Sequence, residues 1–150
     1  MQAAASFRVR CRQLLSVLKT APVMEEELSY IDGYVIAVPT ASKETFIEQA
    51  KVFDGIMMDL GAIRIMECWG DSVPDGKQTD FKRAVQATPE ETVVFSWVEW
   101  PDKATRDAAM EKIHEMMLND ERFDATKNPP CFDGKRMIFG GFVPVVSLEH

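Results

Sequence analysis

Cysteine is scarce in this sequence, and the few cysteines stand far apart. The three are Cys11, Cys68 and Cys131, and no two of them form a CxxC pair. An odd number of widely spaced cysteines argues against a disulfide framework and against a zinc knuckle. Unpaired cysteines are typical of proteins in a reducing compartment, so we expect a cytoplasmic protein.

Histidine is scarcer still, which limits the cofactor sites that the chain can build. His150 belongs to residues 148–150, which resemble the remnant of an expression tag, and His114 is the other histidine. One histidine cannot assemble a zinc site of several histidines or a facial triad. It suffices as a haem ligand, but a surface or half-buried helix position is the commoner role. We therefore expect no metal and no other cofactor.

Basic residues and long apolar runs are also in short supply. The chain has 17 Lys and Arg against 24 Asp and Glu, which gives a formal net charge of −7. An acidic surface repels phosphate backbones, so nucleic-acid binding is disfavoured. The apolar run at 14–18 is interrupted by Lys19 and is too short to span a bilayer. We expect neither nucleic acid nor a membrane as a partner.

What is present is ordinary globular composition in 150 residues, with 46% hydrophobic and 27% charged side chains. A chain of this length and composition fits one domain, which we place at 30–147, with residues 1–29 as an N-terminal extension. Three interpretations of 1–23 stay open: a basic leader, a mobile arm, or a start assigned too far upstream. We favour the last, with Met24 as the true start, because an acidic run and then the globular pattern follow it.

Apolar periodicity predicts four strands and two helices between Tyr30 and Val143. Strands are expected at 30–38, 62–70, 93–100 and 136–143, where β-branched and aromatic residues cluster. Helices are expected after the caps Ser42 and Asp102, with Gly61 ending the first and Asn119 the second. The buried helical stripes are Phe46, Ala50, Phe53, Met57 and Leu60 in the first helix, and Ala109, Ile113 and Met116 or Met117 in the second. Residues 77–92 are predicted to be a polar excursion.

Strand, helix, strand, strand, helix, strand is the pattern of an α+β, ferredoxin-like fold, with two helices on one face of an antiparallel sheet. The later strands carry apolar residues at both parities: Ile65 and Met66, Val94 and Phe95, Ile138 and Phe139. The helix-free face is therefore expected to be apolar and to be buried against a second copy, which predicts a homodimer. Gly140 and Gly141 inside the last strand predict a bulge or a close approach, by the dimer partner or by a ligand.

Several motifs in order carry a family resemblance over nearly all of 30–146. They are YIDGY at 30–34, ECWGD at 67–71, VPDGK at 73–77, TDF at 79–81, VFSW at 94–97 and FDGKRMIFGGF at 132–142. With these motifs the chain resembles the YbaA-like family of bacterial proteins, a domain of unknown function. The family is similar to the dimeric α/β-barrel superfamily, whose members include cofactor-free monooxygenases, haem-handling enzymes and small isomerases. The chain departs from the family pattern at Ser72 and around Pro130-Cys131.

Two carboxylates and two tryptophans stand out as candidate site residues. Glu67 and Trp69 share one face of the second strand, and Trp97 and Glu99 share one face of the third, because strand side chains alternate. If the register aligns the two faces, the four side chains line a pocket between sheet and helices. A carboxylate beside aromatic rings is desolvated, which raises its pKa and suits it to proton transfer. Glu67 and Glu99 are the catalytic candidates on this interpretation.

The alternative interpretation of the two glutamates is structural. Glu67 and Glu99 would then pair with Arg64, Arg83 or Arg136 at the strand ends, because ion-pair networks also perturb carboxylates. Trp69, Trp97, Asp71, Arg64 and Arg136 remain the ligand-binding candidates.

The loop at 71–80 holds three aspartates, Asp71, Asp75 and Asp80, around Pro74 and Gly76. Oxygen-rich loops bind calcium or magnesium, but this spacing does not match an EF-hand, so turn formation is the favoured explanation.

Two functions from different classes fit these observations. The first is a homodimer that binds a small molecule between sheet and helices, with cofactor-free catalysis as an option. The second is a non-catalytic interaction or scaffold module whose tryptophans are core residues. A cavity beside the candidate residues separates them, because a ligand needs room that a filled core does not leave.

Overall fold

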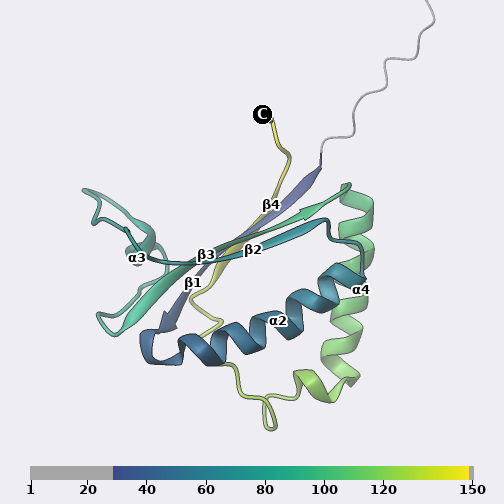
Figure 1. The fold of residues 1–150 in the computed structure, drawn as a ribbon, viewed down its shortest axis with the longest axis horizontal. Coiled ribbons are helices and arrows are strands. Elements are labelled where there is room, and N and C mark those ends of the chain that lie inside the picture. The colour runs from purple at the N-terminus through teal and green to yellow at the C-terminus, as the bar shows by residue number, and fades with distance from the viewer. Residues whose placement is uncertain (1–28, 149–150) are drawn as a thin grey trace, which may run out of the picture.

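A computed structural model of the chain describes residues 29–148, which form a four-stranded antiparallel sheet with two long helices on one face (Figure 1). The strands are β1 (Tyr30–Pro39), β2 (Arg64–Trp69), β3 (Glu91–Trp100) and β4 (Ile138–Phe142), and the long helices are α2 (Lys43–Asp59) and α4 (Lys103–Asn119). The strand order is β2-β3-β1-β4. This confirms the predicted α+β, ferredoxin-like arrangement. The expectations for 1–28 and 149–150 lie outside the described residues.

The strand register decides which side chains face the helices. Tyr34 of β1 pairs with Ser96 of β3, and Ser96 pairs in turn with Glu67 of β2. Since the pairs on either side follow the same alternation, Ile36 and Val94 lie on this face too. These positions form the floor of the space between sheet and helices.

The main core lies between the sheet and the two helices. Its buried members are Ile56 and Met57 of α2, Val98 and Trp100 of β3, Ala109 and Ile113 of α4, and Ala62. Each large apolar side chain removed from water in this way contributes about 1.5–3 kcal/mol. The predicted stripe of α4 is therefore confirmed at Ala109 and Ile113, whereas Met117 is 56% exposed.

The helix ends follow the predicted residues with one difference in mechanism. Asp102 caps α4 by accepting a hydrogen bond from the Thr105 backbone N–H at 2.6 Å. Gly61 follows α2 at φ +109°, a backbone conformation that favours glycine. Ser42 is the N-cap residue of α2, but its side chain makes no capping hydrogen bond. A 3-10 turn, η1 (Thr40–Ser42), leads into the helix instead.

The segment between β2 and β3 contains a helix that the sequence did not reveal. This single turn, α3 (Phe81–Ala84), begins at Asp80, whose carboxylate accepts from the backbone N–H groups of Arg83 at 2.7 Å and Gly76 at 3.0 Å. Val85 follows it and is fully buried against Val35, Ala37 and Val93. These residues lie on the helix-free face, so the predicted polar excursion covers one end of it.

The other end of the helix-free face is open and apolar. Phe95, Ile138 and Phe142 are 42%, 45% and 59% exposed on this side of the sheet. The residues after β4 extend away from the sheet on the side opposite α2 and α4 (Figure 1). The prediction of an apolar helix-free face is thus confirmed.

The glycine pair in β4 makes room for side chains of the same chain. A Cβ on Gly141 would lie 2.2 Å from the Tyr30 hydroxyl, and one on Gly140 would lie 3.2 Å from the Phe142 ring. The pairing of β4 with β1 runs from Ile138 to Phe142 without a skipped residue, so the predicted bulge is wrong. The predicted close approach is real, and it comes from Tyr30.

Another short 3-10 turn, η2 (Glu121–Phe123), follows α4. Among residues 29–148, no helix is both long and apolar enough to cross a membrane.

Candidate functional site

The register separates the two carboxylate and tryptophan pairs that the sequence placed in one pocket. Glu67 lies opposite Ser96, so Glu67 and Trp69 face the helices, while Trp97 and Glu99 point from the other face of the sheet. On that face the Trp97 Nε1–H donates to Glu99 Oε1 at 2.9 Å. The expectation of one pocket lined by all four is therefore wrong. The β3 residue on the same face as Glu67 is Ser96, so its neighbour Trp97 points to the other face.

The alternative expectation, in which arginines pair with these glutamates, is also wrong for the described residues. Arg136 forms a two-pronged ion pair with Glu91, at 2.6 and 2.8 Å. Arg83 lies 3.4 Å from Asp80. The Arg64 guanidinium donates to the Met66 sulfur at 3.7 Å. Neither Glu67 nor Glu99 takes part in an ion pair between residues 29 and 148.

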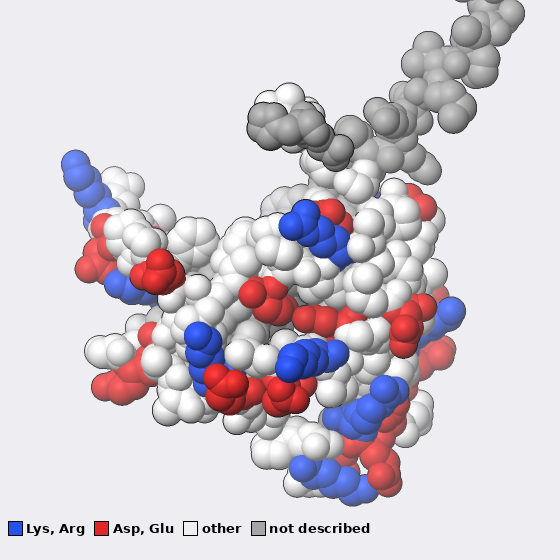
Figure 2. All heavy atoms as spheres, in the orientation of Figure 1, with Lys and Arg blue, Asp and Glu red and all other residues white. Residues whose placement is uncertain are grey.

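A cavity of about 390 Å³ lies between α2 and β2. Figure 2 shows this face of the molecule hollowed between the two elements, with acidic and basic side chains around the hollow. Glu67 and Trp69 line it from β2. Residues from one stripe of α2 line it from the helix: Lys43, Phe46, Ile47, Ala50, Lys51 and Asp54. Spacings of three and four residues put these side chains on one side of α2.

Glu67 is the polar group on the strand side of the cavity. Its side chain is open to solvent through the cavity, yet protein surrounds it closely enough to change its proton affinity. Desolvation first, and then the nearby Asp54 charge, raise the pKa of Glu67 to about 7, against the opposing effect of a hydrogen bond with Ser96. Glu67 therefore exchanges a proton near neutral pH.

Asp54 is a cavity residue that the sequence reasoning missed. Burial raises the pKa of this half-buried carboxyl to about 6. Its position four residues after Ala50, on the row that also carries Phe46, was the signal that could have found it. Two carboxyl groups with raised pKa values thus line one cavity from α2 and β2.

Tyr34 lies on the same face of the sheet as Glu67, and the sequence reasoning missed it as well. Burial first, and then the negative charges of Asp32, Glu67 and Asp54, raise the pKa of the Tyr34 phenol to about 12. The phenol therefore stays protonated at neutral pH and is available as a hydrogen-bond donor.

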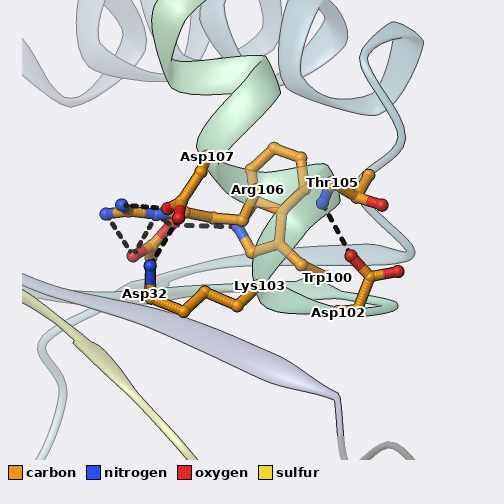
Figure 3. Close-up of polar contacts among 7 residues, drawn as sticks. All are labelled: Asp32, Trp100, Asp102, Lys103, Thr105, Arg106 and Asp107. Carbon is orange, nitrogen blue, oxygen red and sulfur yellow. Dashed lines mark hydrogen bonds and ion pairs between the residues drawn. The ribbon is translucent and has the colours of Figure 1, made fainter.

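A buried ion pair anchors α4 beside this region (Figure 3). The Arg106 guanidinium donates to both carboxylate oxygens of Asp32, with its Nε at 2.9 and 3.1 Å and its Nη2 at 2.9 Å. The Trp100 indole N–H donates to the same carboxylate at 2.9 Å. Asp32 is 1% exposed, so this network satisfies a carboxylate that would otherwise be costly to bury.

The remaining sequence candidates lie outside the cavity. Arg64 is on the opposite face of β2 from Glu67, and Asp71 is an exposed residue after the strand. Arg136 holds Glu91 and Asp133, and this contact lowers the pKa of Glu91 to about 2. Trp97 lines a second, apolar groove of about 460 Å³ on the helix-free face.

The aspartates of the 71–80 loop have structural partners. Asp75 pairs with Lys82 at 3.1 Å, and Asp80 caps α3. Within the described part of the chain, no three His, Cys, Asp or Glu side chains gather as a metal-binding group. His114 is exposed on α4, and the described cysteines, Cys68 and Cys131, are free thiols.

The sheet order and the two helices on one face define a ferredoxin-like α+β protein. A solved structure of this class confirms the fold: a dimeric ferredoxin-like protein from an uncultured marine organism is 13% identical to the chain and superposes with a TM-score of 0.51. The match covers 80% of this chain and 99% of that one.

Sequence comparison then gives the family. Residues 29–134 match the family described as protein of unknown function (DUF1428), and the chain belongs to it. The uncharacterized protein YbaA of Escherichia coli K12 is 46% identical over 120 residues, which is 80% of this chain and 99% of the relative. The uncharacterized protein YbaA of Shigella flexneri has the same identity and coverage. The resemblance inferred from the motifs is therefore confirmed.

Proposed function

We propose that the chain binds a small organic molecule in the cavity between α2 and β2. The observation that carries the proposal is the cavity itself, a recess of about 390 Å³. Its walls are mainly apolar, and its charged groups are the carboxyl groups of Glu67 and Asp54 and the lysines Lys43 and Lys51. Ligand sites are commonly recesses of this size with apolar walls and a few polar groups that orient the ligand. A scaffold module has no need of such a space.

We further propose that Glu67 transfers a proton to or from the bound molecule without a cofactor. A general acid or base works best when its pKa lies near the working pH, and the pKa of Glu67 is about 7. In its ionised form Glu67 accepts a proton from an acidic C–H or O–H group of the ligand. In its protonated form it returns that proton, so the carboxyl group is unchanged after one cycle.

A second copy of the chain is proposed to cover the helix-free face. The groove on this face is lined almost entirely by apolar side chains: Ile31, Phe95, Trp97, Phe142, Val143 and Pro144, together with Gly33. Exposed apolar patches mark protein interfaces, and an isologous pair buries the same patch twice. The marine structural relative is described as dimeric.

The free thiols Cys68 and Cys131 support the cytoplasm as the compartment.

A thermal-shift screen of neutral, anionic and cationic metabolites tests the ligand proposal. A molecule that binds only the native state raises the melting temperature. The Ala50→Phe variant places a ring in the cavity and should lose the shift, whereas Leu118→Ala, on the exposed surface of α4, should keep it. Hits that stabilise Ala50→Phe as strongly as the parent chain, or a screen with no hits, would favour the scaffold function.

A further inference from the structure

The walls of the α2 and β2 cavity combine aromatic rings with carboxyl groups. Phe46 and Trp69 line the recess with their ring centroids 6.2 Å apart and an interplanar angle of 51°. Ile47 and Ala50 add apolar surface from α2. Aromatic faces attract cations through the ring quadrupole, and apolar walls hold the uncharged part of an organic ligand.

An ammonium group already lies beside one of these rings. The Lys43 Nζ is 5.4 Å from the centroid of Trp69, a cation–π distance. The other cavity lysine, Lys51, lies 3.0 Å from the exposed carboxylate of Glu48. Each of these lysines therefore has another partner, and neither forms an ion pair with Asp54 or Glu67 within residues 29–148.

Asp54, which is half-buried, and Glu67, which meets solvent through the cavity, lack the counter-charges that the buried acids of the described residues have. Asp32 has Arg106 and Glu91 has Arg136, but Asp54 and Glu67 enter none of the ion pairs formed within residues 29–148. The charged and titratable groups around them are Lys43, Lys51 and Asp54 on α2, Glu67 on β2, Tyr34 and Asp32 on β1, and Arg106 on α4. A positive charge from outside the chain would offset their mutual repulsion.

We propose that the cavity, if it is the ligand site inferred above, takes a small organic ammonium compound. Its charged group lies between Asp54 and Glu67, and its apolar body packs against Phe46 and Trp69. Primary amines and quaternary ammonium compounds share this chemistry. An anionic ligand is disfavoured because it would meet Asp54 and Glu67, while the two lysines of the recess already have partners.

The proposal links binding to protonation. A bound cation favours the ionised form of a carboxyl group, so it lowers the pKa values of Glu67 and Asp54, and Glu67 enters the complex as the carboxylate, the form that accepts a proton. Protons are therefore released on binding, and affinity rises with pH across the interval from about 6 to about 7 in which these groups titrate.

Calorimetric titration of the full chain with benzyltrimethylammonium tests the proposal, because the charge of this probe does not vary with pH. We expect binding at pH 8 that weakens about tenfold or more at pH 5, as one pKa unit of linkage requires. Benzyl alcohol and benzoate, which are neutral and anionic, should bind more weakly at pH 8. Glu67→Gln and Asp54→Asn should each weaken binding of the ammonium probe about tenfold at pH 8. Asp59→Asn, an exposed site on the same helix, is the matched control and should leave it unchanged.

Each outcome decides the question. Tighter binding of the ammonium probe at high pH, lost in the two cavity variants alone, supports the assignment. No binding at pH 8, no pH dependence, or equal affinity in the variants overturns it. Binding of benzyl alcohol or benzoate that Ala50→Phe abolishes, without ammonium binding, overturns the ammonium assignment and leaves the proposed ligand cavity intact. The pH series on the parent chain decides the matter even if a variant fails to fold.

Discussion

Arg106 on α4 holds both carboxylate oxygens of Asp32 on β1, although 74 residues separate the two in the sequence. The pair closes the space between sheet and helices at the side of α4. The Trp100 indole N–H donates to the same carboxylate, so Asp32 has a second donor besides Arg106.

Removing Arg106 should therefore destabilise the chain strongly. In Arg106→Ala the buried Asp32 loses its counter-charge, and breaking such a pair costs about 3–5 kcal/mol. The measurement is the free energy of unfolding in urea at pH 7. The matched control is Arg122→Ala, which breaks the exposed pair with Asp120 and should cost less than about 1 kcal/mol. Equal losses in the two variants would contradict the anchoring role.

The cavity carboxyls should reverse the usual pH dependence of acidic groups. The pKa values of Glu67 and Asp54 are raised in the folded chain, to about 7 and about 6, so the folded state binds more protons than the unfolded state above pH 4.5. Stability is then lost as the pH rises from about 4.5 to about 7.

Glu67→Gln should remove part of this slope and stabilise the chain at pH 8. We expect the free energy of unfolding to rise by about 1 kcal/mol. This is well below the free energy that corresponds to the full pKa shift, because Glu67 meets water in the cavity. Urea unfolding at pH 5 and pH 8 measures it. Asp59→Asn should leave the change of stability with pH as it is in the parent chain. A Glu67→Gln variant that is less stable than the parent at pH 8 would show that the ionised form of Glu67 does not destabilise the folded chain.

Glu91 should contribute in the opposite direction. The Arg136 guanidinium first, and then the Thr88 backbone N–H, hold the pKa of Glu91 at about 2, below its ordinary value. Its stabilising effect is complete above about pH 4.5 and is lost as the pH falls toward 2. Glu91→Gln should lower the melting temperature at pH 7 and have little effect at pH 2. A decrease of equal size at both pH values would mean that packing, not charge, is what the substitution removes.

Gly141 should not tolerate a side chain. A Cβ there would lie 2.2 Å from the Tyr30 hydroxyl and 2.8 Å from its ring, so Gly141→Ala should cost about 1–3 kcal/mol in urea unfolding. Tyr30→Ala removes the obstructing ring. Gly141→Ala should therefore cost less stability in the Tyr30→Ala background than in the parent chain. Gly134→Ala is the control, because a Cβ there meets nothing within 4 Å. Additive losses in the double variant would argue against the Tyr30 contact.

The proposed dimer should depend on the open end of the helix-free face. Phe142→Asp puts a charge into this apolar groove and should give monomers in light scattering, since burying an unpaired charge at an interface is unfavourable. Leu118→Asp changes a residue that is 72% exposed on α4, outside the groove, and should leave the dimer intact. A parent chain that is already a monomer at micromolar concentration would contradict the proposed dimer.

Much of this fold could be predicted because local signals agreed with one another. Pro39 stops β1, Gly61 and Asp102 lie at helix boundaries, and the spacing of Ala109 and Ile113 gives the buried face of α4. The turn α3 escaped notice because four residues carry no detectable periodicity, although Asp80 in front of them is a typical cap.

The site was harder to predict because it depends on tertiary pairing. Alternation correctly placed Glu67 beside Trp69 and Trp97 beside Glu99, but a shift of one residue in the β2–β3 register exchanges the faces. The sequence does not determine that register by itself. Asp54 could have been found from its place on the α2 stripe, whereas the contact of Asp32 with Arg106 has no signal in the sequence.

The most direct test of the account is a crystal structure of the full chain with the strongest hit of the ligand screen. We predict density for the molecule between α2 and β2, with a polar atom within hydrogen-bond distance of Glu67 and its apolar part against Trp69. Density confined to the helix-free groove, or a recess closed by Phe46 and Ile47 with no room for a ligand, would contradict the central claim.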